Sequence, residues 1–189
     1  GPIGPATSDY FSSSMEKARA MGASAIVVRI DTPGGLSSAM RDIIQDIITA
    51  PAPVISYVAP GGARAASAGT YILYASHVAA MAPGTNIGAA HPVGAGGQEI
   101  NEAMSEKIIN DMVAQAKSVA EKRNRNAKWV EDAIRESVSV TETEALKENI
   151  IDLIAADTDD LIKQLNGRDI NGRGTLKIDD VKKVTIKKN

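Results

Sequence analysis

Ala25-Ile26-Val27-Val28-Arg29-Ile30-Asp31-Thr32-Pro33-Gly34-Gly35 is the stretch that decides the fold: a short apolar run that stops at a Thr-Pro-Gly-Gly turn. A nearly continuous run of β-branched residues is typical of a parallel strand that is buried on both faces. After the turn, Ser37 or Ser38 begins a segment whose methionine and isoleucines recur at helical spacing. The stretch therefore predicts a strand, a tight turn and a helix, which together begin a β-α-β unit.

The same alternation continues on both sides of this stretch. The pattern predicts a helix capped by Thr7 or Ser8 and running to about Met21, strands at 54–58 and 78–81, and a helix from near Ser67 to Tyr74. Repeated β-α-β units imply parallel strands joined by right-handed crossovers. We therefore expect an α/β fold whose glycine-rich turns, 33–35 and 60–62, lie at the same edge of the sheet, where such folds place their sites.

The second half of the sequence is predicted to be mainly helical. Its expected elements are a glycine-rich loop at 92–102, helices near 103–123 and 127–135, a capping box at 141–144, a strand at 150–154, a helix from Asp157 or Thr158 to Gly167, and a terminal hairpin or edge strand within 168–189. No internal repeat or long linker divides the chain. We expect one domain over 1–189, with a first strand that is truncated at the N-terminus.

The composition excludes several classes of function. The 189 residues are 43% apolar, and the net charge of −2 does not favour a nucleic-acid partner. The sequence has no cysteine and only two histidines, so we expect no disulfide, no metal site and no cofactor. No run of 18 apolar residues is present, so no segment is expected to span a membrane.

Ser67 is the candidate nucleophile. It lies among small residues in Ala65-Ala66-Ser67-Ala68-Gly69-Thr70, where a helix is predicted to begin. The free N–H groups at a helix N-terminus can receive an oxyanion when a serine attacks a carbonyl. The turn at Gly34 and Gly35 can supply another such N–H group. Taken locally, a capping serine and an ordinary strand-to-helix turn are equally consistent with these residues.

A serine nucleophile also needs a base, and three residues are candidates. Lys107 stands near the start of the long predicted helix, Lys117 lies ten residues further on, and His91 precedes a proline. A lysine can accept a proton when its surroundings keep it neutral, and a histidine can accept one directly. The spacing along the chain does not decide among the three.

Several motifs together resemble the NfeD family of membrane-bound serine proteases. They are Asp31-Thr32-Pro33-Gly34-Gly35, the stretch 65–70, Met81-Ala82-Pro83-Gly84-Thr85-Asn86-Ile87-Gly88-Ala89-Ala90, Lys107-Ile108-Ile109-Asn110-Asp111, and 120–126. The resemblance covers about residues 1–165. It implies a ClpP/crotonase-like α/β fold with a parallel sheet flanked by helices. One departure is Asn124, where relatives usually have glycine at a helix end.

The resemblance also implies a mechanism and a substrate. It assigns Ser67 as nucleophile, Lys107 as base, and the backbone of Gly34, Gly35 and Ala68 as the oxyanion hole. It implies cleavage of apolar segments, such as those of stomatin-like membrane proteins, by a homodimer or larger assembly. It further implies membrane attachment only through segments outside this sequence, with the protease domain on the extracytoplasmic side and the fragment itself soluble.

Three alternatives stay open from the sequence. His91 follows Ser67 by about as many residues as separate the histidine from the nucleophile in ClpP-type peptidases. A mechanism with a Ser67–His91 pair is therefore a rival. The crotonase fold also serves acyl-CoA enzymes with carboxylate bases, but no glutamate lies between Glu16 and Glu99. A binding or assembly module of the same fold, which would hold an apolar peptide without cutting it, is the third alternative.

Overall fold

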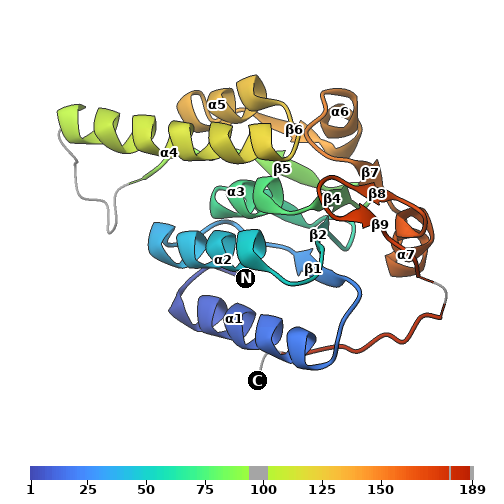
Figure 1. The fold of residues 1–189 in the computed structure, drawn as a ribbon. Coiled ribbons are helices and arrows are strands. Elements are labelled where there is room, and N and C mark those ends of the chain that lie inside the picture. The colour runs from blue at the N-terminus through green and yellow to red at the C-terminus, as the bar shows by residue number, and fades with distance from the viewer. Residues whose placement is uncertain (94–101, 179, 188–189) are drawn as a thin grey trace.

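A four-stranded parallel sheet forms the centre of the molecule. The computed structural model describes residues 1–93, 102–178 and 180–187 (Figure 1). The sheet has the order β1-β2-β4-β7, with strands β1 (Ile26–Ile30), β2 (Val54–Val58), β4 (Val78–Met81) and β7 (Leu153–Ile154). All three pairings are parallel. Every residue of β2 is buried, as expected for a continuous apolar run in a central strand.

A second, smaller sheet lies at the carboxyl ends of these strands and is formed by segments that come between them along the chain. It has the order β3-β5-β6, with β3 (Arg64–Ala66) parallel to β5 (Asn86–Gly88) and β6 (Ser139–Thr141) antiparallel to β5. A bridge between Thr32 and Ala65 joins it to the turn after β1. The amide of Gly62 donates to Gly84 O, so the turn at 60–62 lies at this edge too. The two glycine-rich turns therefore share one edge of the sheet, as predicted.

Helices cover both faces of the main sheet (Figure 1). They are α1 (Pro5–Ala20), α2 (Ser37–Thr49), α3 (Ala68–Ala75), α4 (Glu102–Lys122), α5 (Ala127–Arg135), α6 (Glu142–Lys147) and α7 (Thr158–Leu165). One core cluster contains buried residues of α1 to α6, and a second contains those of α7 and of the hairpin β8 (Asp169–Ile170) and β9 (Gly174–Thr175). The side chains of β2 alternate between them: Val54 and Val58 belong to the first cluster, and Ile55 and Tyr57 to the second.

Some element boundaries differ from the predictions. Helix α1 begins at Pro5 with Gly4 as N-cap, rather than at Thr7 or Ser8, because proline is well suited to the first helical position. The predicted strand at 150–154 is reduced to β7. Pairing in the predicted C-terminal hairpin is confined to β8 and β9, and residues 176–178 and 180–187 form no strand. Most of the predicted loop at 92–102 lies outside the described residues.

Several predicted caps are confirmed. Thr141 and Glu144 form the capping box of α6, and the Asp157 side chain accepts from the amide of Asp160 at the start of α7. Asn124 has a φ of 54°, just beyond the end of α4. Glycine adopts this left-handed conformation most readily, and asparagine is the next most favourable residue. The departure at position 124 therefore leaves the helix end intact.

Candidate functional site

Ser67 occupies a strained position between β3 and α3. Its φ of 51° and ψ of −118° lie outside the helical and extended regions, which for a residue with a Cβ costs on the order of 1–3 kcal/mol. The conformation is held by neighbours, since the Ser67 amide donates to Gly88 O at 3.1 Å and Ser67 O accepts from the amide of Thr70 at 2.9 Å. The half-buried Ser67 hydroxyl makes no hydrogen bond to any described residue. The fold thus presents a free hydroxyl on a backbone that surrounding contacts fix.

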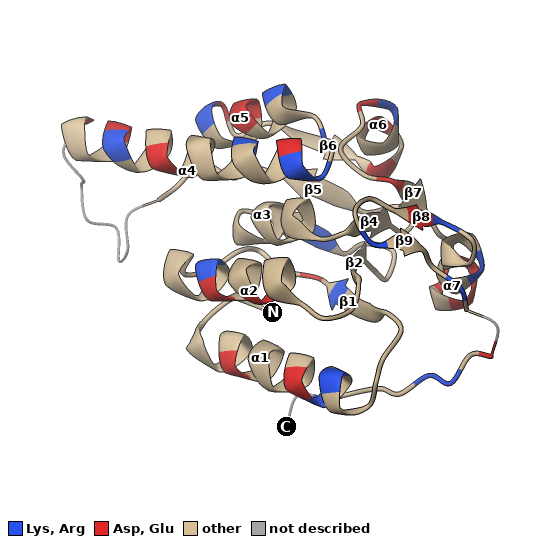
Figure 2. Cartoon of the chain, in the orientation of Figure 1, with Lys and Arg blue, Asp and Glu red and all other residues tan. Residues whose placement is uncertain are grey.

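The first turn of α3 lies directly beside this hydroxyl. All eight residues of α3 are buried and none is charged, and Figure 2 shows the helix without blue or red. The amide of Ala68 has no hydrogen-bond acceptor among the described residues. Free amides at a helix N-terminus carry a positive partial charge. Ala68 therefore offers a donor next to the Ser67 Oγ, as an oxyanion hole requires.

The turn at 33–35 packs against Ser67 from the other side. A Cβ at Gly34 would lie 2.5 Å from Ser67 Cβ and 2.9 Å from Ser67 Oγ, and the φ of Gly34 is +114°. Only glycine fits there. The Gly34 amide donates to Thr32 Oγ1 at 3.1 Å, whereas the amide of Gly35, an exposed residue, has no partner among the described residues. The turn therefore offers Gly35 rather than Gly34 as the free donor.

Thr32 fixes this turn, a role that sequence reasoning missed. Thr32 is buried, its amide donates to Arg64 O at 2.8 Å, and its carbonyl accepts from the amide of Ala66 at 3.1 Å. Its methyl group lies where a Cβ at Gly69 would come within 2.6 Å. One side chain thus holds the Gly34 amide and fills the space above the start of α3. A threonine two residues before a glycine is the sequence signal that could have indicated this hydrogen bond.

Gly88 is a second residue whose role sequence reasoning missed. Its carbonyl accepts from the Ser67 amide and, at 3.3 Å, from the Thr70 hydroxyl. Its φ is +137°, and a Cβ would lie 2.3 Å from Val138 O. Glycine at this position lets β5 approach close enough to hold the backbone of Ser67. In the sequence this glycine stands out only as part of a longer motif.

Lys107 lies near the start of α4 and does not touch Ser67. Its side chain is exposed, and no hydrogen bond joins the two residues. The first fully buried residue of α4 is Met112, more than a turn further along. An ion pair of 2.5 Å between Arg41 on α2 and Asp111 on α4 joins the two helices one turn beyond Lys107. In Figure 1, α2, α3 and α4 all begin on the left of the molecule, so the first turns of α4 lie on the same side as the start of α3.

Lys117 forms an ion pair with a residue of α5. Its Nζ lies 3.0 Å from Glu131 Oε2 on α5, and the same carboxylate accepts from Arg135. These two hydrogen bonds, first that from Arg135 and then that from Lys117, hold the pKa of the half-buried Glu131 carboxyl below its usual range. Lys117 thus contributes to the contact between α4 and α5.

His91 is half-buried and its ring orientation is fixed by the backbone. Its Nδ1 lies 2.8 Å from Ile134 O, so Nδ1 carries the proton and Nε2 is left as an acceptor. The Tyr71 hydroxyl donates to Ala90 O at 3.3 Å, and burial raises the pKa of Tyr71, which keeps the phenol protonated. No described carboxylate is hydrogen-bonded to His91. The acidic member of a Ser-His-acid triad is therefore absent from residues 1–93, 102–178 and 180–187.

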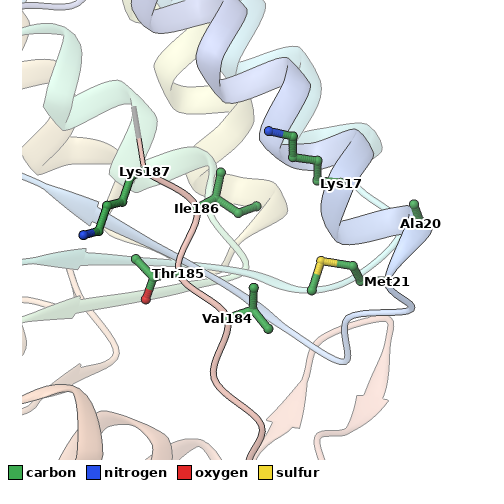
Figure 3. Close-up of a pocket in the computed structure, with 7 residues that line it drawn as sticks. All are labelled: Lys17, Ala20, Met21, Val184, Thr185, Ile186 and Lys187. Atoms are coloured by element: carbon green, nitrogen blue, oxygen red, sulfur yellow. The ribbon is translucent and has the colours of Figure 1, made fainter. Parts of the chain in front are cut away.

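A groove of about 530 Å³ lies away from Ser67, between α1 and the C-terminal tail (Figure 3). Its lining residues are Lys17, Ala20, Met21, Val184, Thr185, Ile186 and Lys187. The tail is held there by Tyr10, whose hydroxyl donates to Ile186 O at 2.6 Å. None of the candidate site residues contributes to this groove, so it belongs to the packing of the tail.

Metal binding and membrane spanning find no support in the described residues. No group of three or more histidine, aspartate or glutamate side chains there could hold a metal ion. In the same part of the chain, no helix combines the length and apolar character needed to cross a bilayer.

The fold and the site together define a class: a ClpP/crotonase-like α/β domain with a strained serine between two amide-bearing turns. The sequence matches the family described as NfeD1b, N-terminal domain, over residues 3–188. The chain belongs to this family, and the resemblance stated from the motifs is confirmed.

Known relatives agree with this assignment. The chain is 44% identical over 180 residues to the membrane-bound protease PH1510 of Pyrococcus horikoshii, a match that covers 92% of this chain and 40% of that protein. This chain therefore spans about two fifths of the relative's length.

Two solved structures are similar to the whole domain. One is a serine-to-alanine mutant of the 1510-N membrane-bound stomatin-specific protease, with a TM-score of 0.85 and 42% identity, covering 94% of this chain and 88% of that chain. The other is a lysine-to-alanine mutant of the same protease in complex with a substrate peptide. Its TM-score is 0.85 at 42% identity, and the match covers 94% of this chain and 84% of that chain. The predicted fold is thereby confirmed.

Proposed function

We propose that this domain is a serine endopeptidase in which Ser67 is the nucleophile and Lys107 the base. The observation that carries the proposal is the geometry at Ser67. A hydroxyl without a hydrogen-bond partner among the described residues, on a strained backbone, lies between the Ala68 amide at the start of α3 and the turn of Gly34 and Gly35. A serine that merely capped α3 would accept a hydrogen bond from the helix, and Ser67 accepts none.

The proposed reaction uses these residues in the following way. The Ser67 hydroxyl gives its proton to the neutral amine of Lys107 as Oγ bonds to the peptide carbonyl carbon. The amides of Gly35 and Ala68 stabilise the oxyanion. The C–N bond then breaks, the leaving amine takes the proton, and water releases the acyl group by the reverse sequence.

Three observations support Lys107 over Lys117 as the base. Lys117 is held by Glu131, whereas Lys107 has no ion pair with any described residue. The serine and the lysine replaced in the two solved relatives are separated along the chain by one residue more than Ser67 and Lys107 are. Lys117 lies ten residues further on and does not match that spacing. Because Lys107 is exposed, the dyad forms when a bound peptide excludes water from the lysine, which disfavours the charged amine.

The substrate we propose is an apolar peptide segment, as in stomatin-like membrane proteins. The 1510-N relative is named as stomatin-specific. Exposed apolar side chains lie close in sequence to three of the candidate site residues of this chain. Leu36 follows Gly35 and is 50% exposed, Val93 is two residues after His91 and is 87% exposed, and Met104 is one turn before Lys107 and is 53% exposed. Burial of these side chains by an apolar peptide is favourable.

We also propose that the full protein acts at a membrane, as the PH1510 relative is named membrane-bound. Attachment comes through segments outside this domain, and the domain faces the extracytoplasmic side. Assembly as a homodimer or larger oligomer is part of the same proposal. Sedimentation of the purified domain tests the assembly, since a monomer at all concentrations contradicts it.

A peptide-cleavage assay on four alanine variants tests the mechanism. Ser67→Ala and Lys107→Ala are each expected to lower kcat/KM by on the order of 10³-fold or more with unchanged melting temperatures. Lys117→Ala and His91→Ala, the matched controls, are expected to stay within about threefold of wild type. Full activity of Lys107→Ala contradicts the dyad.

Two further outcomes identify the alternatives. If His91→Ala alone abolishes cleavage, the ClpP-type Ser-His mechanism operates, which the free Nε2 acceptor of His91 allows. If the wild-type domain retains an apolar peptide intact and Ser67 is not labelled by a fluorophosphonate at elevated pH, the domain is a binding module.

A further inference from the structure

A cluster of cationic side chains lies at the edge of the sheet opposite Ser67. His77 immediately precedes β4 and lies beside the first residue of β2: its amide donates to Val54 O at 2.9 Å, and its Nδ1 accepts from the amide of Val54 at 3.1 Å. Helix α3 begins directly after Ser67 and ends at Ala75, whose carbonyl accepts from Arg123. We call His77, Arg123, Arg125 and Arg173 the basic cluster.

Three arginines of the basic cluster converge on two helix ends. Arg123 Nε donates to Ala75 O at 2.8 Å. Arg125 Nη1 donates to the carbonyls on either side of Ala75, at 3.3 Å and 3.0 Å. Arg173 donates to Ala50 O at 2.7 Å, at the C-terminal end of α2, and to the next carbonyl at 3.1 Å. Cations at helix C-termini stabilise the helix dipole, so these hydrogen bonds alone have a structural explanation.

The positive charge of the basic cluster exceeds its counter-charge. Asp152 is ion-paired with Arg125 at 2.7 Å, and no described carboxylate pairs with Arg123 or Arg173. Burial, together with Arg125 and Arg173, lowers the pKa of Arg123 to about 10. Burial and then the charge of Arg123, followed by Arg173, Arg125 and Lys122, lower the pKa of His77 to about 3. The charges are thus close enough together to repel one another.

Some donors of the basic cluster are not used in the hydrogen bonds to the helix ends and have no acceptor in the part of the chain that the structure describes. Arg123 Nη2 and Arg125 Nε are buried and have no hydrogen-bond partner. The His77 Nδ1 accepts a hydrogen bond, so the neutral ring carries its proton on Nε2, which also has no partner among the described residues. Buried donors are almost always satisfied, and an exception calls for an unseen acceptor. The two buried arginine donors, with His77 Nε2 as a third donor that is not among the buried ones, lie in a region of excess positive charge. This charge favours an acceptor that is itself negative.

We propose that the basic cluster binds a multivalent oxyanion of the phosphate class, held by Arg123, Arg125 and His77. Several donors from different elements suit an ion with several oxygens better than a monatomic anion. Arg173 also lines a groove of about 380 Å³, to whose wall Ser24, Thr175 and Lys177 add polar groups. His77, Arg123 and Arg125 do not line this groove, so Arg173 is the member of the basic cluster that connects the two. Lys122, in the last turn of α4, adds a further positive charge that acts on His77; Figure 2 shows blue at this end of the helix.

The binding site is distinct from the proposed dyad, because α3 separates the two. Its occupancy stabilises the ends of α2 and α3, and Ser67 stands at the start of α3. Anion binding is therefore expected to raise the melting temperature of the domain without being required for cleavage.

Titration with inorganic phosphate tests the proposal, with sodium chloride at equal ionic strength as the reference. The chain has only two histidines, so NMR of the imidazole nitrogens reports the site directly. The His77 signals are expected to move in a saturable way toward the protonated form, and those of His91 to stay unchanged. Equal responses to phosphate and chloride, or equal movement of both histidines, overturn the proposal.

Variants separate specific binding from general attraction. Arg123→Gln is expected to weaken phosphate binding by about tenfold or more, and Lys122→Gln, on the exposed rim, by about two- to threefold. Arg19→Gln, an exposed arginine on α1, is the control and should bind like wild type. If Arg123→Gln does not fold, the Lys122→Gln affinity and the wild-type His77 response decide. If Lys122→Gln and Arg19→Gln weaken phosphate binding by the same factor, the attraction is general and the proposal is overturned.

Discussion

Ser67 and Lys107 are held by the fold in different ways. The nucleophile half of the site, which we define as Thr32, Gly34, Ser67 and Gly88, is joined by backbone hydrogen bonds and by contacts that only glycine allows. The base half, the first turns of α4 up to Asp111, has no fully buried residue and one ion pair to α2. One half is fixed before a substrate arrives, and the other is exposed.

The difference indicates which parts of the chemistry need rigidity. Oxyanion stabilisation depends on donors that are already oriented, because reorienting them during the reaction costs free energy. A lysine base instead needs to lose water, and an exposed lysine loses it only when something covers it. The nucleophile half is therefore expected to be sensitive to small changes in shape, and the base half to substrate and salt.

The largest effect is expected from a methyl group added to the nucleophile half. In Gly34→Ala the new Cβ meets Ser67 Cβ at 2.5 Å on a backbone with φ of +114°. Overpacking and backbone strain together are expected to lower the free energy of unfolding by about 3–5 kcal/mol. Cleavage should be lost at the same time, because Ser67 has to move. Urea denaturation and the peptide assay measure both.

Gly4→Ala is the control for this substitution. A Cβ at Gly4 would have no heavy atom within 4 Å, and the φ of Gly4 is −151°, so this variant should stay within about 1 kcal/mol of wild type. A Gly34→Ala protein that is as stable and as active as Gly4→Ala would show that the nucleophile half is not rigid.

A smaller effect is expected when the turn loses one hydrogen bond. Thr32→Val keeps the shape of the side chain but leaves the Gly34 amide without its 3.1 Å acceptor. An unsatisfied buried donor costs about 1–3 kcal/mol of stability. We expect kcat to fall by about 10- to 100-fold with little change in KM, since the turn positions the oxyanion donor.

Thr85→Val separates stability from catalysis. Thr85 is also buried, and its hydroxyl donates to Ala82 O at 2.6 Å, away from the Ser67 turn. The control should lose a similar amount of stability at unchanged kcat. Equal kcat values for the two variants would refute a positioning role for Thr32.

The sequence was sufficient to predict the nucleophile half in outline and insufficient for its details. The apolar run and glycine turns predicted the strands, the shared edge and the place of Ser67, because these follow from local pattern. The Thr32 backbone pairs with Arg64 and Ala66, more than 30 positions along the chain, and the Gly88 carbonyl accepts from the Ser67 amide, 21 positions away. No local pattern reports such contacts. The choice of Gly35 over Gly34 as donor likewise depends on one side-chain hydrogen bond.

The base half was less predictable for a different physical reason. Apolar periodicity correctly predicted a helix at 103–123, since the buried residues of α4 recur at helical spacing. The same periodicity contains no signal for the surroundings of an exposed lysine. The residues themselves distinguish Lys107 from Lys117 only through the pairing of Lys117 with Glu131, which the fold reveals.

The smallest effect is expected at the link between the two halves. Arg41 on α2 and Asp111 on α4 are ion-paired at 2.5 Å, with side chains 47% and 65% exposed. Exposed pairs contribute about 0.2–1 kcal/mol to stability, so Arg41→Gln should leave the melting temperature nearly unchanged. Because Asp111 lies one turn from Lys107, we expect kcat/KM to fall by about two- to fivefold as the base becomes less well positioned.

Salt provides the decisive comparison for this link. At about 1 M sodium chloride the Debye length is about 3 Å, so the ion pair is screened. The kcat/KM of wild type should then fall by the factor that Arg41→Gln shows at low salt, and the two proteins should cleave at the same rate. Lys128→Gln, which breaks the exposed Lys128–Asp132 pair on α5, is the matched control and should show no change in kcat/KM at either salt concentration. If Arg41→Gln cleaves as fast as this control at low salt, the ion pair does not position Lys107, and the bound peptide alone brings the base to Ser67.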